Sequence, residues 1–145
     1  MQKFLDVNVW LPILWPKHTA SQTAQEWLSR EKEMLVICRV VQLALLRHLT
    51  NSAILGEDVL SNANASKLLQ DILNAGNCQF AEEPLELTSM FPKAGESTNS
   101  RRNVWTDAYL AAFAITGNYE LVTFDRDFSR YRKMGLQMQL LKTQL

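Results

Sequence analysis

Short apolar segments alternate with longer helical patterns along the chain, and this alternation restricts the fold more than any other feature. Apolar runs of strand length are expected at residues 2–5, 34–38, 78–80, 119–123 and 138–141. Helical patterns are expected at residues 9–15, 19–31, 40–49, 60–75, 84–91 and 104–115. Continuous apolar strands are typical of a sheet that is covered on both faces. The sequence therefore predicts one α/β domain over residues 1–145, with a parallel sheet between two helical layers.

Turn and cap residues define the expected ends of several helices. Gly76 follows the 60–75 pattern, in the position where glycine commonly ends a helix. Pro84 is expected at the first position of the 84–91 helix. Asn8 is expected to cap the first helix, and residues 95–102 to form a flexible loop.

Composition and charge exclude several classes of protein. Hydrophobic residues make up 47% of the 145 residues and charged residues 21%, which is ordinary for a globular domain. Lys+Arg and Asp+Glu are equal at 15 each, so contact with a nucleic acid would need a local basic patch. No signal peptide or membrane span is recognisable, and Cys38 and Cys78 lack metal-ligand spacing. We therefore expect a cytoplasmic protein with two reduced, buried thiols.

Three aspartates occupy unusual positions relative to the expected elements. Asp6 and Asp125 each follow a predicted strand, and Asp107 lies in the first turn of the 104–115 helix. Ligands of parallel sheets bind beyond the carboxyl ends of the strands, and carboxylate oxygens are preferred ligands of Mg²⁺ and Mn²⁺. Taken singly, the three residues are explained by a turn, a helix dipole and a loop. Together they favour a metal site at one edge of the sheet.

Three segments resemble a known family. Residues 4–8 (FLDVN), 105–112 (WTDAYLAA) and 122–125 (VTFD) are similar to the signature segments of PIN-domain ribonucleases, and more closely of the VapC toxins of bacterial toxin–antitoxin pairs. Residues 38–40 and 46–51 resemble a subgroup of those toxins. The resemblance runs from residue 2 to about residue 130.

This resemblance implies a Mg²⁺- or Mn²⁺-dependent endoribonuclease that cuts structured RNA, commonly tRNA, with a metal-activated water. By matching position, Asp6 and Asp107 would be the principal metal ligands, and Asp125 would support them or a second ion. Three further residues would orient these carboxylates through hydrogen bonds: Asn8, Thr106 and Thr123. The implied partners are a cognate antitoxin, an RNA substrate and a second copy of the chain.

One position departs from the family pattern. Most members carry a further acid on the helix after the second strand, whereas the closest matching residue here is Gln42. Glutamine can ligate through its carbonyl oxygen but brings no charge, so we expect weaker metal binding. Asp127 could compensate in part or be a solvated charge. Gln42 also leaves open a degenerate PIN module that binds RNA or a protein partner without cleavage.

Basic residues close to the aspartates are candidates for RNA contact. Arg101 and Arg102 precede Asp107, and Arg126 follows Asp125 in a cluster that also contains Arg130, Arg132 and Lys133. They could contact RNA phosphates, although a solvated surface is the alternative for both groups. His18 and His48 lack partners at metal-ligand spacing and are expected to be non-catalytic.

Phosphoryl-transfer enzymes with an aspartate after the first strand are a competing class. The haloacid-dehalogenase pattern requires a second aspartate two residues after the first, where this chain has Asn8. A response-regulator receiver requires adjacent acids and a late lysine, and neither pattern is found.

Overall fold

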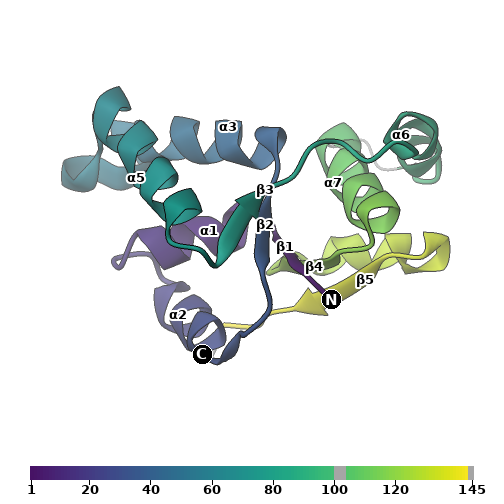
Figure 1. Cartoon of the computed structure of the whole chain (residues 1–145), viewed down its shortest axis with the longest axis horizontal. Coiled ribbons are helices and arrows are strands. Elements are labelled where there is room, and N and C mark those ends of the chain that lie inside the picture. Colours follow the sequence, from purple (N-terminus) through teal and green to yellow (C-terminus); the bar gives the residue numbers. More distant parts are fainter. Residues whose placement is uncertain (100–103, 144–145) are drawn as a thin grey trace.

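Five strands form one fully parallel sheet in the computed structural model, which describes residues 1–99 and 104–143 (Figure 1). The strands are β1 Lys3–Leu5, β2 Leu35–Ile37, β3 Cys78–Phe80, β4 Glu120–Thr123 and β5 Gln137–Leu140. Their order is β3-β2-β1-β4-β5, and every neighbouring pair is parallel. All five lie within two residues of the predicted ranges, so the predicted parallel sheet is confirmed.

Helices cover both faces of this sheet. The α-helices are α1 Val7–Leu14, α2 Ser21–Arg30, α3 Arg39–Leu49, α4 Ser52–Leu55, α5 Asn62–Asn74, α6 Leu87–Glu96 and α7 Val104–Gly117, and the 3₁₀ helices are η1 Gly56–Asp58 and η2 Arg126–Met134. In Figure 1 the sheet is seen on edge, with α1, α3 and α5 on one side and α6 and α7 on the other. The three-layer arrangement is as predicted.

The central strands are apolar throughout because they are covered on both sides. Successive strand residues face opposite sides of a sheet, yet Phe4 and Leu5 of β1 are both fully buried. Phe4 stacks on Phe113 of α7, with ring centroids 4.8 Å apart. Leu121 and Val122 of the neighbouring β4 are likewise fully buried. This core fixes β1 and β4 side by side, with their carboxyl ends at the same edge.

Several predicted boundaries differ from the structure. Helix α6 begins at Leu87 rather than Pro84, because Pro84 lies in the preceding turn and its carbonyl accepts a hydrogen bond from the Leu87 backbone N–H. Gly95 and Glu96, which were expected to begin a loop, are the last residues of α6. Elements α4 and η1 were not predicted.

The structure also bears on the two cysteines and on the length of the apolar helices. Cys38 and Cys78 are free and buried, as predicted. Within the described ranges, no helix combines the length and apolar character needed to cross a membrane.

Gly95 allows a close approach between α6 and α7. A Cβ atom at this position would collide with the Trp105 ring, which packs edge-on against Phe91 with centroids 5.5 Å apart. Glycine is therefore required here for space, although alanine is the better helix former.

We predict that the effect of Gly95→Ala depends on Trp105. In a Trp105→Ala background, Gly95→Ala should stabilise the protein by about 0.5 kcal/mol, because only the helix-propensity gain remains. In the wild-type background the displaced ring should cancel or reverse this gain, giving a coupling of about 1 kcal/mol. A four-member double-mutant cycle in urea measures the coupling, and equal effects in both backgrounds would contradict the proposed contact.

Candidate active site

Asp6 is the most buried of the three predicted acids. It follows β1 and stands at the N-cap position of α1, where its backbone carbonyl accepts hydrogen bonds from the N–H groups of Val9 and Trp10. The residue is only 6% exposed. The predicted cap, Asn8, lies inside the first turn of α1 instead, and its side chain is directed to β4.

The fully buried hydroxyl of Thr123 connects Asp6 to the end of β4. It donates to Asp6 Oδ2 at 2.9 Å and accepts from Asn8 Nδ2 at 3.2 Å and from the Asp125 backbone N–H at 3.0 Å. A hydroxyl has one proton and two lone pairs, so these bonds use its full capacity. Asn8 Oδ1 also accepts from the Phe124 backbone N–H at 3.2 Å. We call Asp6, Asn8, Thr123 and Asp125 the Thr123 network.

Asp125 is the second acid at this edge. It stands at the N-cap of η2, and its Oδ1 accepts a hydrogen bond from the Asp127 backbone N–H at 2.8 Å. Because β4 pairs with β1, the loops that carry Asp125 and Asp6 lie next to each other. Asp127 is exposed.

Asp107 reaches the same region from α7. Its Oδ2 accepts a hydrogen bond from Arg130 of η2 at 3.2 Å, forming a half-buried ion pair. Burial and, after it, the charge of Asp125 raise the pKa of Asp107 to about 6, although Arg130 opposes the increase; Asp6 adds a smaller contribution. Burial likewise raises the pKa of Asp6; its Thr123 hydrogen bond opposes this increase and Asp125 adds to it.

The three carboxylates therefore act on one another electrostatically without forming a closed cluster. In residues 1–99 and 104–143, no three His, Cys, Asp or Glu side chains are arranged so that they could hold a metal ion. The side chain of Asp107 is paired with Arg130, and that of Asp6 is held by Thr123. The arrangement brings excess negative charge to one edge of the sheet, partly balanced by one guanidinium.

Other predicted residues lie at varied distances from this edge. Gln42 is on α3, where its side-chain oxygen accepts a hydrogen bond from Arg39, and it lines a small gap between α1, α3 and α5. Thr106 is exposed on α7, and Arg126 is exposed beside Asp125. Arg101 and Arg102 lie outside the described residues.

Arg130 is a residue of the candidate site that sequence reasoning did not single out. The sequence placed it in a basic cluster whose solvated alternative was left open, whereas the structure shows it half-buried against Asp107 and the Tyr131 ring. The available signal was the proximity of this cluster to Asp125 in the sequence. Which of its four cations turns inward depends on the 3₁₀ geometry of η2.

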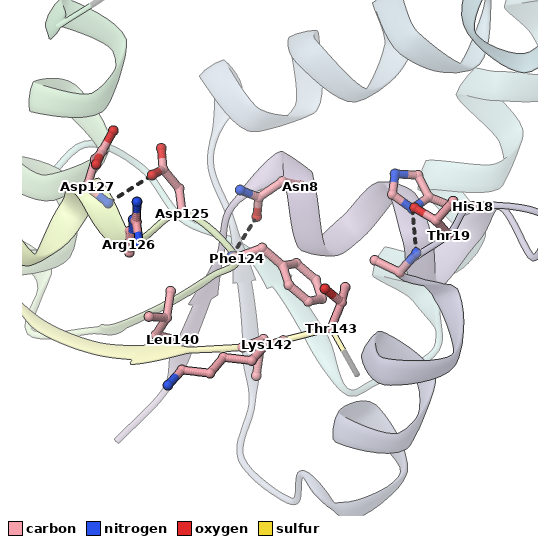
Figure 2. Close-up of a pocket in the computed structure, with 12 residues that line it drawn as sticks. Asn8, His18, Thr19, Phe124, Asp125, Arg126, Asp127, Leu140, Lys142 and Thr143 are labelled. Carbon is pink, nitrogen blue, oxygen red and sulfur yellow. Dashed lines mark hydrogen bonds between the residues drawn. The ribbon is translucent and has the colours of Figure 1, made fainter. Parts of the chain in front are cut away.

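A cleft of about 770 Å³ opens beside Asp125 (Figure 2). Asp125, Arg126 and Asp127 lie at one end, and His18 and Thr19 at the other, with Phe124 and Lys142 between them. The cleft is continuous with the Thr123 network because Asn8 and Asp125 line it.

Comparison with known proteins assigns the class. The PIN domain family model matches residues 3–134. The chain is also 35% identical over 142 residues to Ribonuclease VapC41 of Mycobacterium tuberculosis, covering 94% of this chain and 96% of that protein. The chain therefore belongs to the PIN-domain family. Within that family it is a ribonuclease of the VapC type, as the sequence motifs predicted.

Solved structures agree with the fold. VapC20 of Mycobacterium tuberculosis superposes with a TM-score of 0.68 at 16% identity, covering 92% of this chain and 95% of that one. VapBC-1 of nontypeable Haemophilus influenzae also superposes with a TM-score of 0.68, at 14% identity, covering 97% of this chain and 98% of that one. FitAcB of Neisseria gonorrhoeae superposes with a TM-score of 0.64 at 21% identity, covering 94% of this chain and 95% of that one.

We predict that Thr123→Val lowers the free energy of unfolding by about 2–3 kcal/mol. Valine preserves the shape but leaves the half-buried Asp125 N–H without its acceptor and the buried Asp6 without its donor, and unsatisfied groups of this kind are costly. Urea denaturation measures the change. Thr116→Val is the matched control, because the Thr116 hydroxyl donates only to the Ala112 carbonyl within α7. Equal losses for the two variants would contradict the central position of Thr123.

The raised pKa of Asp107 predicts a pH-dependent stability of the metal-free protein. Because the folded pKa of about 6 exceeds the ordinary value of 3.8, the folded state binds the proton more tightly than the unfolded chain. This contribution is complete below about pH 4 and is lost as pH rises through about 6. In EDTA, Asp107→Asn should therefore raise the Tm relative to wild type more at pH 7.5 than at pH 5, on the order of 3 °C.

Taking the Tm of Asp107→Asn minus the Tm of wild type at each pH removes the contribution of the other titrating groups, because both proteins share them. Asp71→Asn is the control, since Asp71 is exposed on α5 and pairs with Lys67. A Tm difference for Asp107→Asn that does not change with pH would contradict the raised pKa.

Proposed function

We propose that this chain is a Mg²⁺- or Mn²⁺-dependent endoribonuclease toxin that cuts structured RNA, with tRNA as the first candidate. The observation that carries the proposal is the electrostatic coupling of Asp6, Asp107 and Asp125 at the carboxyl edge of the sheet, where burial first and the neighbouring acids second raise the pKa values of Asp6 and Asp107. Such uncompensated negative charge favours a bound cation. The identity to Ribonuclease VapC41 supports RNA as the substrate class.

The residues fit a hard divalent ion in chemistry. All three side chains offer carboxylate oxygens, which Mg²⁺ and Mn²⁺ prefer. Asp107 would have to exchange Arg130 for the ion, because in the structure it is paired with that guanidinium. The ion, when bound, would relieve negative charge on the phosphodiester and lower the pKa of water.

The chain's own residues have separable tasks in this proposal. Thr123 and Asn8 hold Asp6 in one orientation through the Thr123 network, as hydrogen-bonded partners of metal ligands commonly do. Arg130, once released from Asp107, is a cation within reach of a phosphate at this edge. Gln42 is engaged by Arg39 on α3, so the proposal assigns it no charge-bearing task and retains the expectation of weaker metal binding.

A cognate antitoxin is the proposed protein partner, and cytoplasmic RNA the proposed target. Structures named VapBC-1 and VapBC2 are among the proteins that share this fold, and their names support a paired system. VapC20 is described as a Sarcin-Ricin loop cleaving toxin, so ribosomal RNA is an alternative target to test beside tRNA. We also propose a homodimer.

The wild type should cut tRNA or ribosomal RNA in the presence of Mg²⁺ or Mn²⁺ and lose this activity in EDTA. Asp107→Asn should reduce cleavage at least about a hundredfold, because a catalytic metal contributes several kcal/mol to the transition state. Asp71→Asn, the same change on an exposed surface, should cut normally. Gel assays with total tRNA and ribosomal RNA fragments measure the rates.

Divalent ions should also raise the Tm of the wild type by mass action, and raise that of Asp107→Asn less. If the wild type cuts neither RNA and its Tm does not respond to Mn²⁺, the degenerate module that binds without cleavage replaces this proposal. The lack of a closed metal cluster among the described side chains is the observation in favour of that alternative.

A further inference from the structure

We propose that the cleft beside Asp125 binds single-stranded RNA next to the cut site, with one base stacked on Phe124 and its phosphate contacted by Lys142. The inference rests on the proposed function and names how that site would hold its substrate. The cleft, of about 770 Å³, lies in the range of 300–1,000 Å³ typical of ligand sites.

Phe124 lies next to the acidic edge of the sheet. Its backbone N–H donates to Asn8 Oδ1, and the next residue is Asp125. The ring is half-buried and lines the cleft, pointing toward Thr143 in Figure 2. A half-buried aromatic ring that lines a cleft is a candidate platform for stacking, which tolerates any base because every base has a π-face.

Lys142 supplies the charge beside this platform. The Leu141 backbone N–H donates to the Thr123 carbonyl at 2.8 Å, so the chain after β5 is fixed next to β4. The exposed Lys142 ammonium makes no ion pair or hydrogen bond with any residue that the structure describes. Arg126, the other arginine or lysine among the described residues that line the cleft, lies at the same end as Asp125 and Asp127, and these two acids offset its attraction for a phosphate. The flanking phosphate is therefore assigned to Lys142, which lies between the two ends of the cleft.

His18 adds a hydrogen-bond donor at the far end of the cleft. Its Nδ1 accepts from the Ala20 backbone N–H at 3.0 Å, so the neutral ring carries its proton on Nε2. Burial lowers the pKa of His18, which favours this neutral form. A base edge or a 2′-hydroxyl can accept from Nε2.

The chemistry of the cleft favours RNA over a protein segment. Large exposed hydrophobic side chains, which anchor protein interfaces, lie elsewhere on the described surface: Met1, Leu43, Ile54, Val59, Leu85 and Trp105. The cleft instead combines an aromatic ring, two cations (Arg126 and Lys142), two acids and polar donors. Its continuity with the Thr123 network places such a ligand beside the acids.

The test uses Phe124→Leu and Lys142→Met, which keep the apolar part of each side chain. Phe80→Leu on β3, at the opposite edge of the sheet, and Lys67→Met on α5 are the matched controls. On a single-stranded oligoribonucleotide containing the cut site, Phe124→Leu should raise KM about tenfold and leave kcat within about twofold, because stacking acts on binding. The controls should leave both unchanged.

Substrate truncation identifies the occupant. Nucleotides are removed singly from the 5′ and 3′ sides of the oligonucleotide. One removal should raise KM for the wild type and not for Phe124→Leu, because that variant has already lost the contact. If every truncation affects the two proteins equally, the stacking assignment is wrong.

A measurement of RNA binding tests the inference even if the protein does not cut the oligonucleotide. Fluorescence anisotropy with the labelled oligonucleotide in EDTA requires no catalysis, and Lys142→Met should reduce the slope of log K against log salt by about 0.7, as for one single-strand phosphate contact. If the wild type cuts no RNA but binds it with this difference from Lys142→Met, the proposed nuclease activity is refuted and the proposed RNA-binding subsite is retained. Active wild type with unchanged KM and slope in the variants refutes the subsite alone. Variants that bind RNA normally but lose antitoxin inhibition would reassign the cleft to a protein partner.

Discussion

The buried hydroxyl of Thr123 is the interaction on which the acidic edge of the sheet depends. It joins the end of β4 to the acid that follows β1 and to the first turn of α1. Each of these groups would be costly to bury unpaired, and the hydroxyl satisfies three of them at once. The position of Asp6 is thus determined by strand pairing in the core, because Thr123 can reach it only when β1 and β4 are neighbours in register.

The same edge carries an excess of negative charge. Burial and mutual repulsion raise the pKa values of Asp6 and Asp107, and Arg130 offsets this only in part. A core optimised for stability alone would not gather acids at this place, since paired carboxylates disfavour each other's ionised form. Perturbed pKa values are typical of functional sites. The cost to the folded chain and the cation binding that we propose therefore have one physical origin.

Strand positions and the locations of Asp6 and Asp125 could be predicted because both depend on local patterns: an apolar run, then a polar residue at its end. Asp107 followed from its place in the first turn of a buried helix. Arg130 could not be predicted, because its inward direction depends on packing between η2 and α7. The end of α6 was missed for a similar reason, since Gly95 is a loop signal in sequence but fits closely against a ring on another helix.

The separation of 117 residues between Asp6 and Thr123 has a consequence for synthesis. A chain still emerging from the ribosome contains Asp6 long before it contains Thr123, Asp125 or Arg130. During that time the first strand lacks the neighbour that orients its acid. Under the proposed function, the nuclease would therefore stay inactive until β4 has left the exit tunnel and paired with β1.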